Sequence, residues 1–192
     1  MSGFKSTELF GGALVADLPA TFSDISTIRQ VPDHQEIYLD PNGFTNIIIE
    51  VNERVSAEDA CTDMEALKYH FKDIVASETD EVKFWSEDAA NLTKMPDAPA
   101  LVLFATTHPL EGDKRAKDDF TGIMLLLIRL EKQTADILIA INVPHVPGEY
   151  EKDAINLDQQ KIGPHLEAGL AIRKHILESF EVKDWSLFGT DE

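Results

Sequence analysis

The fold is decided by residues 120–143, which read FTGIMLLLIRLEKQTADILIAINV. Two almost continuously apolar runs, 120–130 and 136–143, flank a short polar link at 131–135. Apolar runs of this length predict strands, and so short a link joins them as an antiparallel hairpin. Because apolar residues do not alternate with polar ones, we expect the hairpin to lie in the centre of a sheet with both faces covered.

Further strands are predicted before this hairpin along the chain, where apolar and β-branched residues gather between turn residues. The clearest is 45–55, in which Ile47, Ile49 and Val51 alternate onto one face. The others are expected at 11–17, 35–39, 82–85 and 101–107.

A first helix is predicted from a variant capping box, in which Ser56 precedes an acidic residue, Asp59, by three positions. Apolar residues then recur at steps of four and three, which places them on one helical face. The helix is expected to end near residue 76. Cys61, close to its start, is interpreted as a small buried hydrophobe. The predicted apolar face consists of Ala60, Met64, Leu67, Phe71 and Ile74.

A second helix is predicted from about Pro164, after a polar loop at 150–161. Arg173 interrupts its apolar stripe, so an edge of that stripe is expected to meet solvent. The aromatic residues within 182–188 are expected to dock on the body of the protein. The predicted stripe consists of Leu166, Leu170, Arg173, Leu177 and Phe180.

These elements favour the α+β class over a doubly wound parallel fold, because strands come in runs with two main helices and the hairpin is antiparallel. The 192 residues suit a single domain over 1–192, and no internal repeat or linker divides them. A chain of this length buries well over half of its unfolded surface, so it needs no disulfide or metal to hold it together.

The formal net charge is −18, from 35 acidic and 17 basic residues. Such a surface repels nucleic acid and anionic lipid, and it favours encounter with basic proteins. Solubility alone explains the same charge equally well. The composition therefore argues against nucleic acid and membrane partners without naming the partner that binds.

The compartment expected from the sequence is a reducing one, the cytosol or the nucleus. The single cysteine cannot form an intramolecular disulfide, and residues 1–10 contain no apolar core of a signal peptide. The longest apolar run, 123–128, is too short to span a bilayer.

No catalytic residue, metal site or cofactor is predicted. The chain contains no P-loop, no G-x-G-x-x-G and no G-x-S-x-G sequence, and no two histidines have the helical spacing of a metal site. The six histidines are interpreted as structural or solvated. Carboxylate pairs such as Asp33/Glu36 and Glu50/Glu53 arise by chance in so acidic a chain, although a small hydrolase that uses such a pair stays open.

Residues 8–40 carry a dense polar cluster on short elements, which is typical of a contact surface. One strong cation, Arg29, stands among Asp24, Asp33, Glu36 and Asp40. Apolar side chains lie beside this cluster, and we expect at least one to be exposed as an anchor for a partner. These apolar residues are Phe22, Ile25 and Ile28.

Several segments together resemble the Ran guanine-nucleotide-release factors. The most specific is V-P-D-x-Q-E at 31–36, and the order and spacing of the segments cover most of the chain. The match is weak at 79–119 and 147–164. The resembling segments are 9–13, 24–29, 31–33, 35–38, 47–50 with Glu53, 69–71 with Asp73, 128–130, 134–138 and 186–189.

This resemblance implies a single α/β/α sandwich around a largely antiparallel sheet. It also implies binding to the small GTPase Ran and release of its bound guanine nucleotide, in support of nuclear protein import. It implies no cofactor and no covalent chemistry, and we expect a monomer in nucleus and cytoplasm. An acidic adaptor that binds Ran or another basic protein without exchange activity is the alternative.

The resemblance also implies six partner-binding positions, each of which has a purely structural interpretation. Asp24 can cap a turn, Arg29 can pair with a nearby acid, and Glu50 can be an ordinary outward-facing strand residue. Residues three apart in a regular strand point to opposite faces, so Glu50 and Glu53 share a surface only if the strand ends or bulges near Asn52. The six positions are Asp24, Arg29, Asp33, Glu36, Glu50 and Glu53.

Overall fold

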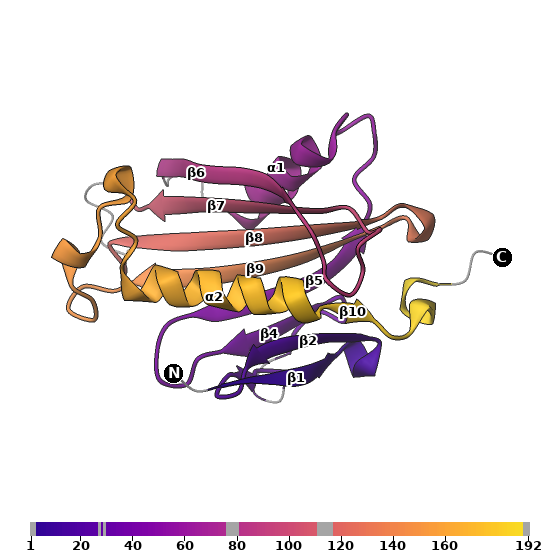
Figure 1. Cartoon of the computed structure of the whole chain (residues 1–192), viewed down its shortest axis with the longest axis horizontal. Helices are drawn as coiled ribbons and strands as arrows, with labels where there is room; N and C mark the ends of the chain where they lie inside the picture. Colours follow the sequence, from indigo (N-terminus) through magenta and orange to yellow (C-terminus); the bar gives the residue numbers. More distant parts are fainter. Residues whose placement is uncertain (1–2, 27, 29, 76–80, 111–116, 190–192) are drawn as a thin grey trace.

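The computed structural model describes residues 3–26, 28, 30–75, 81–110 and 117–189. A seven-stranded antiparallel sheet forms its centre, in the order β3-β4-β5-β9-β8-β7-β6 (Figure 1). Its strands are β3 (Ser23–Asp24), β4 (Gln35–Leu39), β5 (Asn46–Glu53), β6 (Glu81–Ala90), β7 (Ala100–His108), β8 (Phe120–Leu130) and β9 (Ala135–His145).

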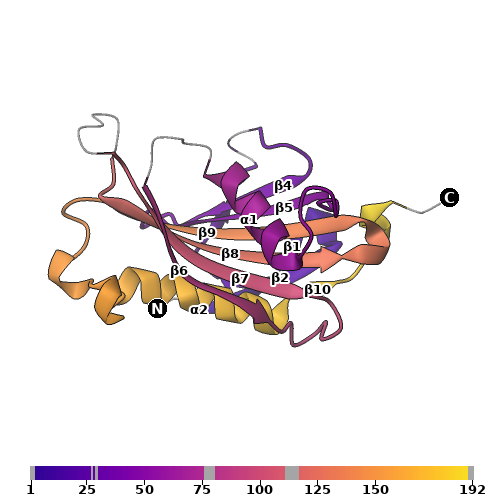
Figure 2. The same cartoon turned by 90° about the horizontal axis from the view of Figure 1, so that it is seen from above.

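Helix α1 (Asp63–Ile74) covers one face of this sheet, and helix α2 (Gly163–Ser179) covers the other (Figure 2). The seven-stranded sheet has a hydrophobic core on each side. A three-stranded antiparallel sheet lies beside α2 and completes the larger of these two cores. The predicted α+β sandwich around an antiparallel sheet is therefore confirmed. The strands of the smaller sheet are β1 (Phe4–Leu9), β2 (Leu14–Pro19) and β10 (Glu181–Val182), in the order β1-β2-β10.

The predicted central hairpin is confirmed. Every residue of β8 except Thr121 is buried, and β5 and β7 flank the hairpin on either side. The link turns through a short 3-10 segment, Glu131–Gln133, and Thr134 closes it with a left-handed φ of 48°. The register places Arg129 directly opposite Asp136.

The predicted strand at 45–55 is confirmed as β5, with Ile47 and Ile49 fully buried and Val51 half-buried. The strand predicted at 11–17 is partly wrong. It begins at Leu14, because Gly11 and Gly12 adopt positive φ angles in the tight corner after β1.

The predicted start of the first helix is wrong. Helix α1 begins after Thr62, whose hydroxyl accepts from the Glu65 amide while the Glu65 carboxylate accepts from the Thr62 amide. Ser56 and Asp59 bond to each other in a separate turn, where the Ser56 hydroxyl accepts from the Asp59 amide and donates to the Asp59 carboxylate. Cys61 lies between the two and is exposed, so its predicted burial is wrong as well. The predicted end near residue 76 lies outside the described residues.

The predicted stripe of the second helix is also wrong in part. Leu166 and Phe180 are buried, but Leu170, Arg173 and Leu177 are only half-buried at its edges. The centre of the buried stripe is Gly169, Ile172 and Ile176. A Cβ atom at Gly169 would lie 2.7 Å from Met124 Sδ, so the glycine lets α2 approach β8 closely.

The chain beyond α2 docks only in part as predicted, because Phe188 packs against the larger core whereas Trp185 is 46% exposed. Residues of β10 pair with Val15 and Leu14 of β2, and the amides of Lys183 and Asp184 donate to the Ala13 carbonyl. The short 3-10 segment Trp185–Phe188 then packs partly on the larger core.

Candidate functional site

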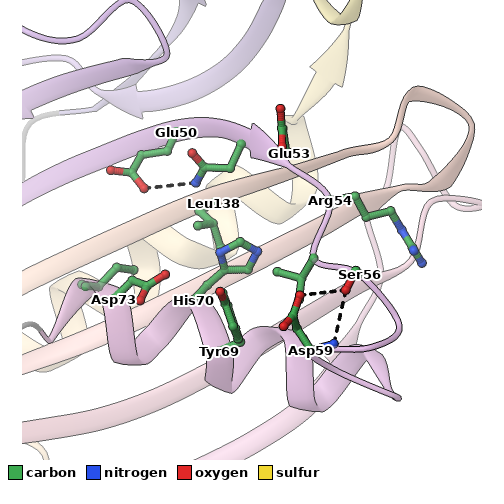
Figure 3. A pocket seen from close by; sticks show the side chains of 12 residues that line it. Glu50, Glu53, Arg54, Ser56, Asp59, Tyr69, His70, Asp73 and Leu138 are labelled. Atoms are coloured by element: carbon green, nitrogen blue, oxygen red, sulfur yellow. Dashed lines mark hydrogen bonds between the residues drawn. The ribbon is translucent and has the colours of Figure 1, made fainter.

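A polar cleft of about 540 Å³ separates the end of β5 from helix α1 (Figure 3). Strand β5 forms one wall, the turn before α1 forms the end, and α1 forms the other wall. We call it the acidic cleft. Its lining residues are Glu50, Asn52, Glu53, Arg54, Val55, Ser56, Asp59, Tyr69, His70, Asp73, Ile74 and Leu138.

Glu50 lies on the wall that β5 contributes. Its carboxylate accepts from the side-chain amide of Gln35 on β4, its cross-strand neighbour, and from Asn52 Nδ2 at 3.4 Å. Both donors are uncharged, so they orient the carboxylate and leave its negative charge uncompensated. Glu50 is thereby a fixed charge on the α1 side of the sheet.

The charge balance of the cleft is negative. Glu50, Asp59 and Asp73 contribute three carboxylates, Glu53 adds a fourth at the rim, and Arg54 contributes one guanidinium. Within the described part of the chain, none of the four carboxylates is in an ion pair. Like charges gathered in one cleft create a local field that attracts a cationic partner group.

Helix α1 contributes an aromatic side chain, Tyr69, to the cleft as well as the acidic Asp73. Tyr69 is 43% exposed and packs edge-on against the buried His70, with ring centroids 6.0 Å apart. Asp73 is exposed one turn further along the helix. An exposed tyrosine beside carboxylates suits contact with a protein partner, where tyrosine is enriched.

A buried ionic network fixes the walls of the cleft. Arg129 Nε donates to Asp136 Oδ1 at 3.0 Å across the hairpin, and Asp136 Oδ2 lies 3.0 Å from His70 Nε2. Arg129 Nη1 reaches Asp63 at 2.8 Å, in the first turn of α1. The network therefore ties α1 to the central hairpin through the helix start and its middle.

The same network holds the end of β5. The Val55 amide donates to Asp136 Oδ2 at 3.0 Å, and the Val55 carbonyl accepts from Arg129 Nη2 at 2.9 Å. Burial alone would raise the pKa of Asp136, but bonds from His70, Val55 and Arg129 outweigh it and lower that pKa. Asp136 therefore stays ionised in the interior as the anchor of both cleft walls.

The predicted site residues do not form one cluster. Glu50 faces the acidic cleft on the α1 side, whereas Glu53, at the cleft rim, points to the other side of the strand (Figure 3). Asp24 on β3 is the cross-strand neighbour of Tyr38 on β4. Asp24 and Glu36 therefore lie on the face of the sheet that points away from the acidic cleft.

The remaining predicted residues are away from the cleft lining or outside the described chain. Asp33 is exposed in the turn before β4, and Arg29 lies outside the described residues. Asp24 caps a local turn, since its carboxylate accepts from the amide and the hydroxyl of Ser26. Of the predicted apolar anchors, Phe22 and Ile25 are buried, and Ile28 is 83% exposed, as expected for one of them.

Glu36 has a structural role. It accepts from the Phe10 amide at 2.6 Å and from the Tyr38 hydroxyl at 3.3 Å, which ties β4 to the corner between β1 and β2. Burial raises its pKa, against the effect of these bonds. Phe10, whose amide makes this bond, adopts a φ of 50°, which is unusual for a bulky residue.

Sequence reasoning missed Asp59, Tyr69 and Asp73 as cleft residues, and it missed the buried network behind them. A signal for the network was present. Arg129 and Asp136 are opposite charges inside apolar runs, placed symmetrically about the hairpin link. Buried charges are almost always paired, so the two were candidates for a cross-strand ion pair.

Two kinds of site are absent from the part of the chain that the structure describes. No group of three histidine, cysteine or carboxylate side chains there is placed to hold a metal ion. No helix there has the length and apolar character needed to cross a membrane.

Comparison with known proteins identifies the family of this chain. The family described as "Ran-interacting Mog1 protein" matches residues 7–144. A protein of Bos taurus named "Ran guanine nucleotide release factor" is 38% identical over the full length of both chains. A protein of Dictyostelium discoideum named "Probable ran guanine nucleotide release factor" is 29% identical over 96% of each chain.

The solved structures agree with this assignment. The crystal structure of the Saccharomyces cerevisiae Ran-binding protein Mog1p superposes with a TM-score of 0.75 at 25% identity. The superposition covers 98% of this chain and all of that one. The chain described here belongs to the family of Ran-interacting Mog1 proteins.

Proposed function

We propose that this chain binds the small GTPase Ran through the acidic cleft and promotes release of its bound guanine nucleotide, in support of nuclear protein import. The observation that carries the proposal is the set of three carboxylates, Glu50, Asp59 and Asp73, that line one 540 Å³ cleft without a described ion-pair partner, with Glu53 at its rim. Family membership supplies the identity of the partner.

A basic side chain of the partner is the natural occupant of the cleft. Glu50 is already oriented by two neutral amides, so it can accept from an ammonium or guanidinium group without first losing an internal ion pair. Asp73 and Asp59 add attraction from the other walls. Charge complementarity of this kind speeds encounter and fixes the orientation of the two proteins.

Release of nucleotide follows from linkage. If the chain binds nucleotide-free Ran more tightly than loaded Ran, it must weaken nucleotide binding by the same factor. Small GTPases hold their nucleotide with a lysine, backbone amides and Mg²⁺. A carboxylate that pairs with a basic group near these elements biases them away from the nucleotide-holding state.

We propose that two groups of residues contact Ran, a primary one and a secondary one. Glu50, with Glu53 at the rim and Asp59, Tyr69 and Asp73 around it, forms the primary contact. The residues expected from the sequence at 24–36 form a second contact region, with Ile28 as an apolar element. These residues are Asp24, Arg29, Asp33 and Glu36, of which Glu36 acts indirectly by holding the β1–β2 corner.

Two alternatives are less well supported. An acidic adaptor would use the same cleft to bind Ran without altering exchange. A hydrolase would need a carboxyl group shielded from water as general acid, whereas Glu53, Asp59 and Asp73 are exposed. We therefore propose that the chain performs no covalent chemistry. We also propose that it acts as a monomer in nucleus and cytoplasm.

The test is release of fluorescently labelled GTP and GDP from loaded Ran, with and without the chain. We expect the chain to accelerate release, and the Glu50→Lys variant to lose that acceleration. The matched control is Glu178→Lys, which reverses an exposed charge on α2, away from the cleft lining. Binding without acceleration would support the adaptor, and no binding would refute the proposal.

A further inference from the structure

The turn between β4 and β5 contains a dipeptide that is chemically reactive, Asn42-Gly43. The ladder of the two strands ends before it, and the Asp40 amide donates to the Thr45 carbonyl at 3.0 Å and closes the turn. All of residues 41–44 are exposed. None of these four residues lines the acidic cleft, so the turn is independent of the proposed Ran contact.

An asparagine that precedes a glycine can rearrange without an enzyme, which is one reason why asparagine is a thermolabile residue. The backbone nitrogen of the glycine attacks the side-chain carbon Cγ of the asparagine. The new N–Cγ bond closes a succinimide ring, and the side-chain nitrogen leaves as ammonia together with the proton of the attacking amide. Water then opens the ring at one of its carbonyls and gives either aspartate or isoaspartate, in which the main chain runs through Cγ.

Asn42 is the asparagine of this chain that precedes glycine, whereas every other asparagine precedes a residue with a larger side chain. A larger side chain shields the attacking nitrogen and restricts the backbone angles that ring closure needs. The best comparison is Asn91, which is exposed like Asn42 but precedes the fully buried Leu92. The side chains of the remaining asparagines take part in hydrogen bonds; these are Asn46, Asn52, Asn142 and Asn156.

Both reacting groups of the turn are held weakly. The Gly43 amide donates to the Asp40 carbonyl at 3.4 Å, which is longer than the usual range for such a bond. Among the described residues, none bonds to the side-chain amide of Asn42, although its backbone amide donates to Asp40 Oδ1 at 3.0 Å. The side chain is therefore free to turn toward the Gly43 nitrogen, and ring closure breaks only one weak bond within the protein.

The structure also favours glycine at position 43. A Cβ atom there would lie 2.7 Å from Asp40 Oδ2, so a larger residue would displace this carboxylate. Displacement would disturb the bond that Asp40 Oδ1 accepts from the Asn42 amide. The packing of the turn thus keeps the residue that leaves the attacking nitrogen least shielded.

We propose that Asn42 is a site of spontaneous modification, at which the folded protein loses a side-chain amide and acquires isoaspartate or aspartate. Either product adds one negative charge to the turn, and isoaspartate also adds one carbon to the main chain. An isoaspartate in an exposed turn is accessible to the class of enzyme that methylates isoaspartyl carboxylates with S-adenosylmethionine as the methyl donor. The modified turn is therefore a substrate for that class of methyltransferase.

The modification acts on the hairpin of β4 and β5. Isoaspartate lengthens the main chain between Asp40 and Thr45, so the bond that closes the turn is lost. The far end of the hairpin keeps its own contact, in which Gln35 bonds to Glu50. We therefore expect the modified protein to be less stable and to retain the acidic cleft.

The test is incubation of the folded chain at neutral pH and body temperature, followed by peptide mapping with mass spectrometry that distinguishes aspartate from isoaspartate. We expect Asn42 to be converted at least roughly tenfold faster than Asn91, with isoaspartate as the main product. Methylation of the incubated chain by an isoaspartyl methyltransferase measures the isoaspartate independently. Conversion of Asn42 no faster than that of Asn91 would overturn the proposal.

The same chain unfolded in guanidinium chloride is the reference for the effect of the fold. Because the turn needs little local opening to react, we expect Asn42 in the folded chain to be converted at no less than roughly a tenth of the unfolded rate. A far slower conversion in the folded chain would show that the turn protects Asn42, and the proposal would be wrong.

Two variants test the site and its consequence. Asn42→Gln moves the amide carbon one bond further from the Gly43 nitrogen, so the incubated variant should lose methyl acceptance. Methylation equal to that of the wild type would place the isoaspartate elsewhere and refute the site. Freshly prepared Asn42→Asp carries the added charge without the extra carbon, and the isoaspartate form should melt roughly 2–4 °C below it. Equal melting temperatures would refute the loss of the bond that closes the turn.

Discussion

Arg129 and Asp136 face each other across the central hairpin and pair at 3.0 Å, with 4% and none of their respective surfaces exposed. The pair also reaches His70 and Asp63 of α1 and the backbone at Val55. One buried ion pair thereby positions both walls of a cleft whose own acids are at the surface. Changes at the pair should act on stability first and on binding only through the geometry of the cleft.

The first prediction concerns this pair. Arg129→Leu should lower the free energy of unfolding by about 3–5 kcal/mol, because Asp136 would remain charged in the interior with fewer partners. Urea unfolding measures the loss. The control is Lys132→Met in the exposed link of the same hairpin, which should change stability by less than about 0.5 kcal/mol. Equal small effects in both variants would mean that Asp136 is compensated without Arg129.

The second prediction is a loss of stability in mild acid. Burial lowers the pKa of His145 to about 4 from an ordinary 6.5, so between these values the unfolded chain binds a proton that the folded chain does not. The free energy of unfolding should therefore fall as the pH falls from 6.5 to 4, by about 3 kcal/mol in all. Urea unfolding across this pH range measures the slope.

His145→Phe separates this effect from general acid denaturation. The variant should have a flatter slope between pH 6.5 and 4, since it lacks the imidazole that takes up this proton on unfolding. It should still lose stability below pH 3.8, the ordinary pKa of an aspartate, because the pKa of Asp136 is lowered in the folded state. An unchanged slope would assign the mild-acid loss to another group.

The third prediction concerns Glu50. Glu50→Lys should weaken binding to Ran by roughly tenfold or more, because it places a cation where a basic partner group is expected. The melting temperature should change by no more than about 2 °C, since only two neutral amides bond to the carboxylate. Calorimetric titration and thermal melts together measure this. Wild-type affinity in a folded variant would remove Glu50 from the contact.

The fourth prediction is the response of Ran binding to salt. Screening acts over about 8 Å at physiological ionic strength, so added salt should slow association by roughly tenfold or less. Dissociation should change little if apolar contacts also hold the complex. The exposed Ile28 and Tyr69 are candidates for those contacts. A dissociation rate that rises as steeply as association falls would show that charge alone holds the two proteins.

The sequence predicted those features that depend on neighbours along the chain. The hairpin of β8 and β9 was predicted because the runs 120–130 and 136–143 are almost continuously apolar and only five residues link them. The residue at which a helix starts and the face that it buries were harder to predict from the sequence. Ser56 with Asp59 and Thr62 with Glu65 are both capping patterns, and only packing on the sheet selects the second.

Prediction of the cleft residues from the sequence was limited in the same way. Glu50 was predicted and lies in the cleft, but Tyr69 and Asp73 join it from a helix that is about twenty residues further on. Strand β1 was not predicted, because the polar sequence FKSTEL becomes a strand only by pairing with β2. Neither the pairing of β1 with β2 nor the approach of α1 to β5 leaves a pattern in the local sequence, so these residues could be assigned only from the fold.

The pairing of β10 with β2 has a consequence for how the protein is made. Val182 lies opposite Leu14, so the smaller sheet joins residues from distant parts of the chain. During synthesis, β1 and β2 leave the ribosome early and wait for the last partner of their sheet. Contacts so remote in sequence form slowly, and until they form the second edge of β2 stays open to other chains. A ribosome that stalls before residue 181 therefore leaves a nascent chain exposed to misassembly, and chaperones should bind it at β2.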